Sequence, residues 1–136
     1  MPQTPAPSFQ NAAGQVAAHP AGFLCLTWSA GPRQLADTQA LFGAVAAGLR
    51  RLGTSRLLVD QTLMPPFSPG ELHWFTQEWL PGEGRDSGYR YGAIVVAHNV
   101  LSRLATATIT TNSQRDWLRY RSFDTIEAAT AWLVNG

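Results

Sequence analysis

The stretch Phe67-Ser68-Pro69-Gly70-Glu71-Leu72, which follows the short apolar run Arg56–Asp60, decides the fold that this sequence predicts. Ser68 is a favoured N-cap residue, Pro69 suits the first position of a helix, and Glu71 completes a capping box. The run before them is short and apolar, as expected of a buried parallel strand. A buried strand followed by a well-capped helix is the repeating unit of an α/β domain.

A hairpin and a long helix are predicted before this unit. Residues 15–19 and 23–28 form two strand-like runs, and the Pro20-Ala21-Gly22 between them suits a tight antiparallel turn. Pro32 suits the first residue of a helix, and apolar residues then recur every three or four positions until Gly53. The predicted buried face of this helix consists of Leu35, Thr38, Phe42, Val45, Leu49 and Leu52.

After Ser68 the pattern predicts one more central strand, one edge strand and a final helix. The helix that Ser68 caps is expected to end near Leu80-Pro81-Gly82, before a polar loop over residues 83–88. Residues 91–97 are the most apolar run and predict a central strand, and residues 117–121 alternate like an edge strand.

The last helix is expected to take Asp124 as its cap, with Ile126, Ala129, Thr130 and Leu133 buried. Residues 98–112 are left open between a short helix and irregular structure.

Together these elements predict an α/β fold. We expect a mixed, mainly parallel sheet of about five strands, with an N-terminal antiparallel hairpin and about four helices packed on it. Residues 1–8 contain three prolines and are predicted to be a disordered leader, and residues 9–136 a single domain.

Composition narrows the classes of partner. The net charge is +1 with no basic run, so nucleic acid is not an expected partner. Charged residues make up only 14% of the chain, which favours a surface partly covered by a protein partner. Cys25 lies in an apolar run and reads as a small buried hydrophobe. No secretory signal or membrane span is visible, so we expect a cytoplasmic protein.

The pattern of elements resembles that of the small STAS-like bacterial proteins. The resemblance is carried by Val59-Asp60, Glu78-Trp79-Leu80-Pro81, the strand Ala93-Ile-Val-Val-Ala97 and the closing Phe123-Asp-Thr-Ile-Glu-Ala-Ala-Thr-Ala-Trp132-Leu133. STAS names a domain shared by sulfate transporters and anti-sigma-factor antagonists. The resemblance implies a mixed, mainly parallel sheet and, in many members, no known activity.

The resemblance also implies a candidate phosphorylation site. The antagonist branch carries a phosphorylated serine at the start of the helix after the third strand, within an Asp-Ser-Ser/Thr-Gly-like sequence. In this chain Asp60 is followed by Gln61-Thr62-Leu63-Met64-Pro65-Pro66, and Ser68 is the nearest counterpart of that serine. A phosphate there would have to displace the cap, so we expect Ser68 to be structural.

Polar side chains at the predicted carboxyl ends of the strands are the candidate binding residues. Asp60 and His98 follow adjacent parallel strands, and Thr62, Ser68 and Asn99 could border the same place. The alternative is that Asp60 caps the turn after its strand while His98 is an ordinary loop residue, and we favour this alternative. No catalytic residue and no cofactor is predicted. Scattered histidines indicate no metal site.

The sequence therefore favours two candidate functions. The first is a non-enzymatic interaction domain that binds a protein partner or forms a homodimer. Trp74, one of five tryptophans, is a candidate interface residue if it is exposed. The second is the binding of a small molecule at the strand ends, namely an anionic metabolite, a nucleotide or a lipid.

Overall fold

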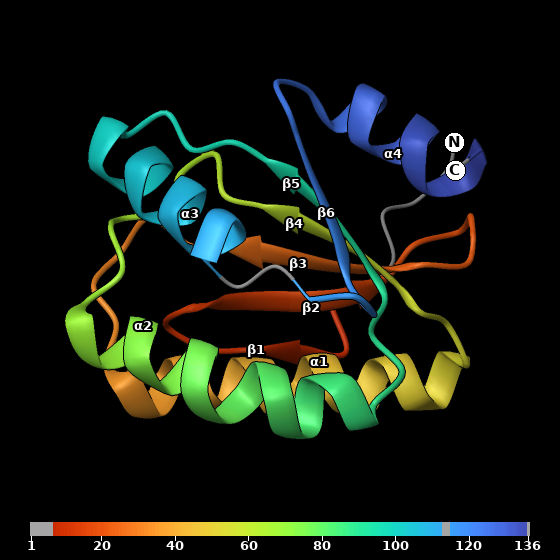
Figure 1. Ribbon diagram of the computed structural model, residues 1–136, viewed down its shortest axis with the longest axis horizontal. Helices are drawn as coiled ribbons and strands as arrows, with labels where there is room; N and C mark the ends of the chain where they lie inside the picture. Colours follow the sequence, from red (N-terminus) through yellow and green to blue (C-terminus); the bar gives the residue numbers. More distant parts are fainter. Residues whose placement is uncertain (1–6, 113–114, 136) are drawn as a thin grey trace.

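The computed structural model describes residues 7–112 and 115–135 and contains a six-stranded mixed sheet with helices on both faces (Figure 1). The strands lie in chain order, from β1 to β6. The first three are antiparallel, and β3 to β6 are parallel. This confirms the predicted α/β class. The strands are β1 (Phe9–Gln10), β2 (Gly14–Ala18), β3 (Leu24–Trp28), β4 (Arg56–Asp60), β5 (Tyr91–Val95) and β6 (Arg119–Phe123).

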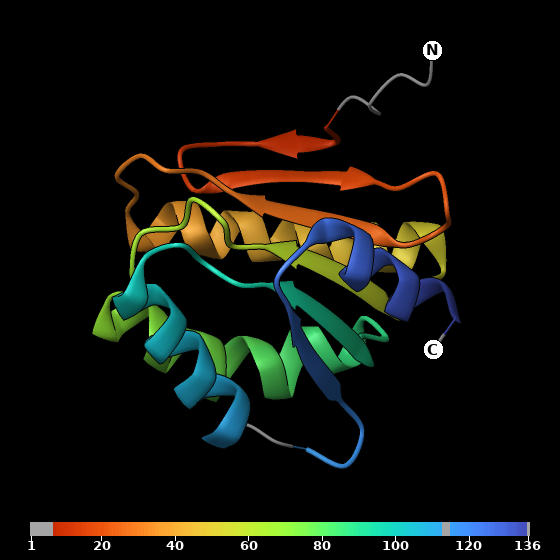
Figure 2. The same cartoon turned by 90° about the horizontal axis from the view of Figure 1, so that it is seen from above.

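The helices divide between the two faces of the sheet (Figure 2). Each parallel connection steps one strand in the same direction, so right-handed crossovers place their helices on one face. The chain's last helix, α4, is no crossover and packs on the opposite face, against β4, β5 and β6. The helices are α1 (Leu35–Leu52), α2 (Pro69–Trp74), the π-helix η1 (Phe75–Gly84), α3 (Val100–Asn112) and α4 (Ile126–Asn135).

The predicted hairpin is present, and it gains a third strand. Strands β2 and β3 pair from Gly14 opposite Trp28, and Gly22 takes a positive φ of 94° in the turn between them. The short strand β1 pairs with β2, and the backbone N–H of Ser8 donates to Val16 O at 2.8 Å. Ser8 therefore belongs to the folded domain. Residues 1–6 of the predicted leader lie outside the described residues.

Helix α1 begins later than predicted. Its first residue is Leu35, because the side chain of Asp37 accepts a hydrogen bond from the backbone N–H of Gln34 at 2.9 Å and so sets the cap there. Its predicted end is confirmed by Gly53, which has a φ of 65°. Leu35 and Leu52, predicted to be buried, are 40% and 41% exposed because they lie at the ends of the helix.

The helix capped by Ser68 runs past its predicted end. It continues as η1 through Pro81 to Gly84 and then through Arg85 and Asp86, so residues 83–86 of the expected polar loop are helical. Tertiary packing accounts for this. The indole N–H of Trp79 donates to Phe42 O at 3.1 Å. A Cβ on Gly84 would lie only 2.8 Å from the Trp79 ring, so this turn is pressed onto that side chain. These contacts override the local tendency of proline to end a helix.

In the C-terminal third, the structure decides one segment that the sequence left open and differs from the prediction at two boundaries. The open segment 98–112 contains α3, a helix that extends to Asn112. Strand β6 is an edge strand, as predicted, but it starts at Arg119. The cap of α4 is Thr125 instead of Asp124, since its Oγ1 accepts from the N–H of Ala128 at 3.1 Å.

The start of α2 is tied to the rest of the protein by a buried ion pair. Arg33 Nε lies 2.7 Å from Glu71 Oε2, and the two side chains are only 4% and 5% exposed. Arg33 also donates to the carbonyl oxygens of Pro65 and Pro66, both at 3.2 Å. Glu71 additionally accepts from Thr38 Oγ1 at 2.5 Å. One carboxylate thus joins α1, the loop after β4 and the start of α2.

Removing the charge of Glu71 should strongly destabilise the fold. The Glu71→Gln variant keeps an acceptor for the cap but leaves the buried Arg33 unpaired, which should cost about 3–5 kcal/mol. Urea unfolding at neutral pH measures this loss. Glu83→Gln is the matched control, because the Arg50–Glu83 pair is 3.7 Å apart with side chains 50% and 47% exposed. That change should cost no more than about 1 kcal/mol.

The stability difference between wild type and Glu71→Gln should depend on pH. Burial raises the pKa of Glu71, but the hydrogen bonds from Arg33, Ser68 and Thr38 and the charge of Arg33 outweigh it and hold that pKa below its usual 4.5. The ionised carboxylate therefore stabilises the fold above pH 4.5, and this contribution is lost as pH falls through the lowered pKa. The gap between wild type and Glu71→Gln should narrow below pH 4.5. A gap that stayed constant there would contradict this role.

Candidate functional site

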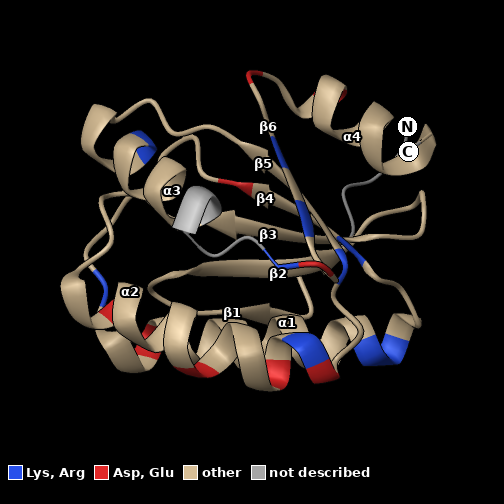
Figure 3. Cartoon of the chain, viewed as in Figure 1, with Lys and Arg blue, Asp and Glu red and all other residues tan. Residues whose placement is uncertain are grey.

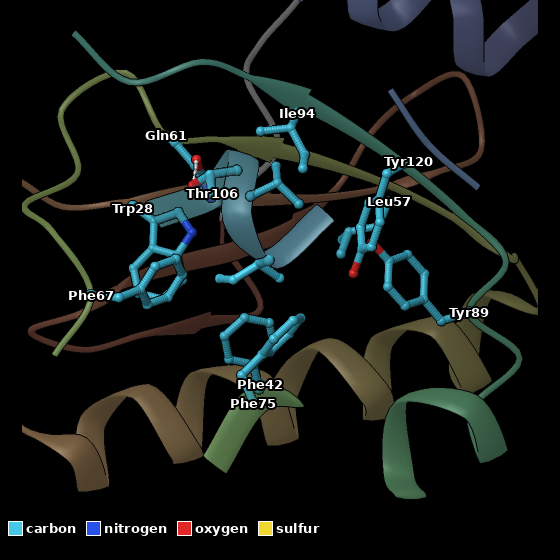
Figure 4. Close-up of a pocket in the computed structure, with 12 residues that line it drawn as sticks. Trp28, Phe42, Leu57, Gln61, Phe67, Phe75, Tyr89, Ile94, Thr106 and Tyr120 are labelled. Atoms are coloured by element: carbon cyan, nitrogen blue, oxygen red, sulfur yellow. Dashed lines mark hydrogen bonds between the residues drawn. The ribbon is translucent and has the colours of Figure 1, made fainter. Parts of the chain in front are cut away.

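A cavity of about 40 Å³ lies between the sheet and the helices of the α1 face (Figure 4). Strand alternation explains its floor, since Leu57, Val59, Ile94 and Tyr120 all point to this face. Helix α1, η1 and α3 supply the opposite wall. The residues around the cavity are mainly apolar and aromatic: Trp28, Phe42, Leu57, Val59, Gln61, Phe67, Phe75, Tyr89, Ile94, Thr106, Ile109 and Tyr120.

Two polar atoms in this wall have no hydrogen-bond partner among the described residues. They are the indole Nε1 of Trp28 and the hydroxyl oxygen of Tyr120, and both are buried. In Figure 4 the indole nitrogen of Trp28 points toward the middle of the cavity. A buried donor without a partner costs about 1–3 kcal/mol, and most buried polar groups in proteins are paired. Two such atoms around one cavity make it the candidate binding site.

Tyr89 and Tyr120 form an adjoining pair of aromatic side chains. Their ring centroids are 6.2 Å apart in an edge-to-face arrangement. Burial, together with the neighbouring Tyr120 hydroxyl, raises the pKa of Tyr89 well above 10. Burial likewise raises the pKa of Tyr120 above its usual value. Both hydroxyls therefore stay protonated at neutral pH, and each keeps a proton to donate.

One polar pair closes the end of the cavity that lies toward the carboxyl ends of the strands. Thr106 Oγ1 donates to Gln61 Oε1 at 2.7 Å (Figure 4). Gln61 follows β4 directly and is 4% exposed, and Thr106 lies in α3 and is 6% exposed. This bond and the one from Ser102 Oγ to Met64 O, at 2.7 Å, tie α3 to the loop after β4.

The residues predicted at the strand ends lie beside this cavity but do not line it. Asp60 Oδ1 accepts from the N–H and the hydroxyl of Thr62, at 3.0 and 2.5 Å, so it closes the turn after β4. The backbone N–H of His98 donates to Thr62 O at 3.1 Å, and the side chain of His98 is exposed. The structure thus brings Asp60, Thr62 and His98 together as a turn, and their role in binding stays a prediction.

Ser68 and Asn99 are both helix caps. Ser68 Oγ accepts from the N–H of Glu71 at 3.1 Å, and the Ser68 N–H donates to Glu71 Oε1 at 2.8 Å. Asn99 Oδ1 accepts from the N–H groups of Leu101 and Ser102, at 2.9 and 3.2 Å. A phosphate on Ser68 would meet the Glu71 carboxylate and lose this cap, which favours the structural role.

Two further sequence predictions concern Trp74 and Cys25. Trp74 is half-buried, with its ring 5.9 Å from that of Phe42, so the core on the α1 face already covers part of its surface. Burial, together with the charge of Asp60, raises the pKa of Cys25 to about 11. The thiol therefore stays protonated at neutral pH. Cys25, predicted to be buried, is only half-buried against the core on the α4 face.

Sequence reasoning missed the residues that line the cavity. Gln61 lies in the loop after β4, Thr106 in α3 and Tyr120 in β6, and no local motif connects them. The available signal was strand alternation, which places Gln61 on the face of Val59 and Asp60 on the other.

Comparisons with protein-family models, with curated proteins and with solved structures find no match for this chain. Within residues 7–112 and 115–135, no cluster of three or more His, Cys, Asp or Glu side chains could hold a metal ion. In the same residues, no helix has the length and apolar character needed to cross a membrane.

Gly92 sets the position of both tyrosines, and replacing it should disturb them. A Cβ there would lie 2.2 Å from the Tyr89 hydroxyl and 2.7 Å from the Tyr120 ring. Gly92→Ala should therefore cost about 1–3 kcal/mol, measured by urea unfolding. Gly43→Ala is the control, because its Cβ would meet nothing within 4 Å and alanine favours the helix by up to about 1 kcal/mol. Equal stability of Gly92→Ala and wild type would refute this packing.

Proposed function

We propose that this protein binds, without chemical conversion, a small and largely apolar molecule that carries a hydrogen-bond acceptor. The observation that carries the proposal is the pair of unpartnered buried groups, Trp28 Nε1 and Tyr120 Oη, around one aromatic cavity. Pockets that bind small molecules are typically apolar with a few placed polar groups. The described residues that line this one include no carboxylate, imidazole or thiol, which favours binding over catalysis.

The chemistry of the two groups specifies the ligand. An indole N–H only donates, and a phenol whose pKa is raised keeps its proton. A carbonyl or ether oxygen would satisfy either group. A water molecule in the cavity could accept the same hydrogen bond. A ligand gains binding free energy over water because it replaces that hydrogen bond and also buries apolar surface.

The size of the cavity requires one wall to move. A cavity of about 40 Å³ is smaller than the roughly 150 Å³ that holds a benzene molecule in an engineered protein core. Helix α3 is the wall with the fewest attachments, since it exposes most of its large apolar side chains and contributes Ile109 to the core. A segment with few buried apolar contacts opens at low cost in free energy.

Acetophenone and ethylbenzene provide a matched pair of probes, because only the first has an acceptor. We expect acetophenone to move the indole N–H signal of Trp28 in ¹H–¹⁵N NMR spectra and to bind about fivefold more tightly than ethylbenzene. The Trp28 signal is the one that Trp28→Phe removes. Tyr120→Phe, which deletes only the hydroxyl, should reduce the preference for acetophenone.

Trp74→Phe is the control, because Trp74 does not line the cavity. It should leave the preference for acetophenone unchanged. A Trp28 signal that neither probe moves up to its solubility limit would refute the proposal. Equal binding of both probes would refute the role of the unpartnered donors.

Self-association is the second candidate, and an exposed apolar surface favours it. Leu63, Val100, Leu101 and Leu104 are 63%, 67%, 65% and 60% exposed. The last three are neighbours on α3, and hydrogen bonds hold the loop of Leu63 against the start of that helix. Contiguous exposed apolar side chains commonly mark interfaces, and a second copy of the chain could cover them in a two-fold contact.

Sedimentation at several concentrations tests this second candidate. Wild type should approach a dimer as its concentration rises, and the double variant Leu101→Ser with Leu104→Ser should remain monomeric. Leu52→Ser is the control, because Leu52 is 41% exposed at the far end of α1. A wild-type protein that is monomeric at every concentration would exclude the dimer.

A further inference from the structure

A second pocket, of about 220 Å³, lies at the carboxyl ends of β4, β5 and β6 beside α3. It shares Gln61 and Thr106 with the aromatic cavity. Its lining is more polar than that of the cavity. The residues are Gln61, Val96, Ala97, Arg103, Thr106, Ala107 and Ser122.

The two spaces follow one another along the same face of the sheet. Tyr120 lines the cavity, and Ser122, two residues further along β6, lines the outer pocket. The same step leads from Val59 on β4 to Gln61, just after that strand, which lines both spaces. Residues two apart on a strand share a face and lie roughly 7 Å from each other. Gln61 and Thr106, which are joined by a hydrogen bond, line both spaces.

Charge distinguishes the outer pocket from the inner cavity. Arg103 is the only charged residue of α3, visible as the blue segment on that helix in Figure 3. It is exposed and forms no ion pair with another described residue. No carboxylate is present among the described residues that line the outer pocket. A free guanidinium beside an apolar cavity is suited to an organic anion.

We infer that the cavity and the outer pocket form one continuous site for an amphipathic carboxylate. Its apolar part, which carries a carbonyl oxygen, lies against Trp28 and Tyr120, and its carboxylate binds Arg103 in the outer pocket. The Gln61–Thr106 hydrogen bond opens to let the connecting carbons pass. This inference rests on the proposed function and names its ligand class.

The carboxylate 3-benzoylpropionate and its methyl ester are the probes, because both contain the aryl ketone and only one is anionic. At neutral pH the anion should bind wild type about tenfold more tightly than the ester, and Arg103→Gln should abolish that advantage. Affinity for the ester should not change. Arg51→Gln is the matched control, since it removes the same charge from the exposed end of α1.

The Trp28 indole signal separates the outcomes. Movement of this signal by the anion, together with loss of the advantage in Arg103→Gln, supports the continuous site. Equal binding of the anion and the ester overturns the ligand class but leaves the proposed cavity function standing. Binding that depends on Arg103 while the Trp28 signal stays still overturns the continuity of the two spaces. Failure of both probes overturns this inference, whereas the proposed function falls only if acetophenone also leaves the Trp28 signal unmoved.

Discussion

The ion pair between Arg33 and Glu71 is the contact on which the arrangement of this protein depends. Four of the five N–H groups of Arg33 donate to Glu71 and to the carbonyls of the two prolines before α2. Its guanidinium carbon also lies 4.9 Å from the centre of the Trp28 ring. A buried charge is tolerated only when it is fully paired. The pair therefore holds the segment before α1, the start of α2 and one wall of the cavity in a single arrangement.

The cavity follows from how differently the two faces of the sheet are packed. On the α4 face, Ala93 and Ala129 let the helix lie close to the strands. On the other face, large rings such as Trp28, Phe42 and Tyr120 meet from several elements. Rings are rigid and cannot fill every gap between them, and protein interiors have few such gaps. Two unpartnered buried polar atoms, Trp28 Nε1 and Tyr120 Oη, border the space left on that face, which makes it the strongest candidate for a binding site.

Helix α3 connects the two proposed functions. Its inner side contributes Ser102, Thr106 and Ile109 to buried contacts, and its outer side exposes apolar residues to solvent. A ligand that displaced its inner side would also move its outer side, so occupancy of the cavity and self-association would be coupled through one element. The outer pocket beside this helix lies at the carboxyl ends of the strands, where ligands of open α/β sheets commonly bind.

The sequence by itself determined the elements whose signals are local. The capping box of Ser68 and Glu71, the turn at Gly22 and the helix end at Gly53 follow from backbone chemistry within a few residues. Tertiary structure alone decided what depends on residues distant in the chain. Helix η1 continues past Pro81 because the indole N–H of Trp79 donates a hydrogen bond to the carbonyl oxygen of Phe42, 37 residues earlier. Gln61, and not its neighbour Asp60, reaches the cavity because it lies on the face of the sheet that meets α3. Only the assembled sheet reveals which face this is. Local signals specify where elements begin and end, whereas a site requires side chains from several elements to converge, and no single segment encodes that convergence.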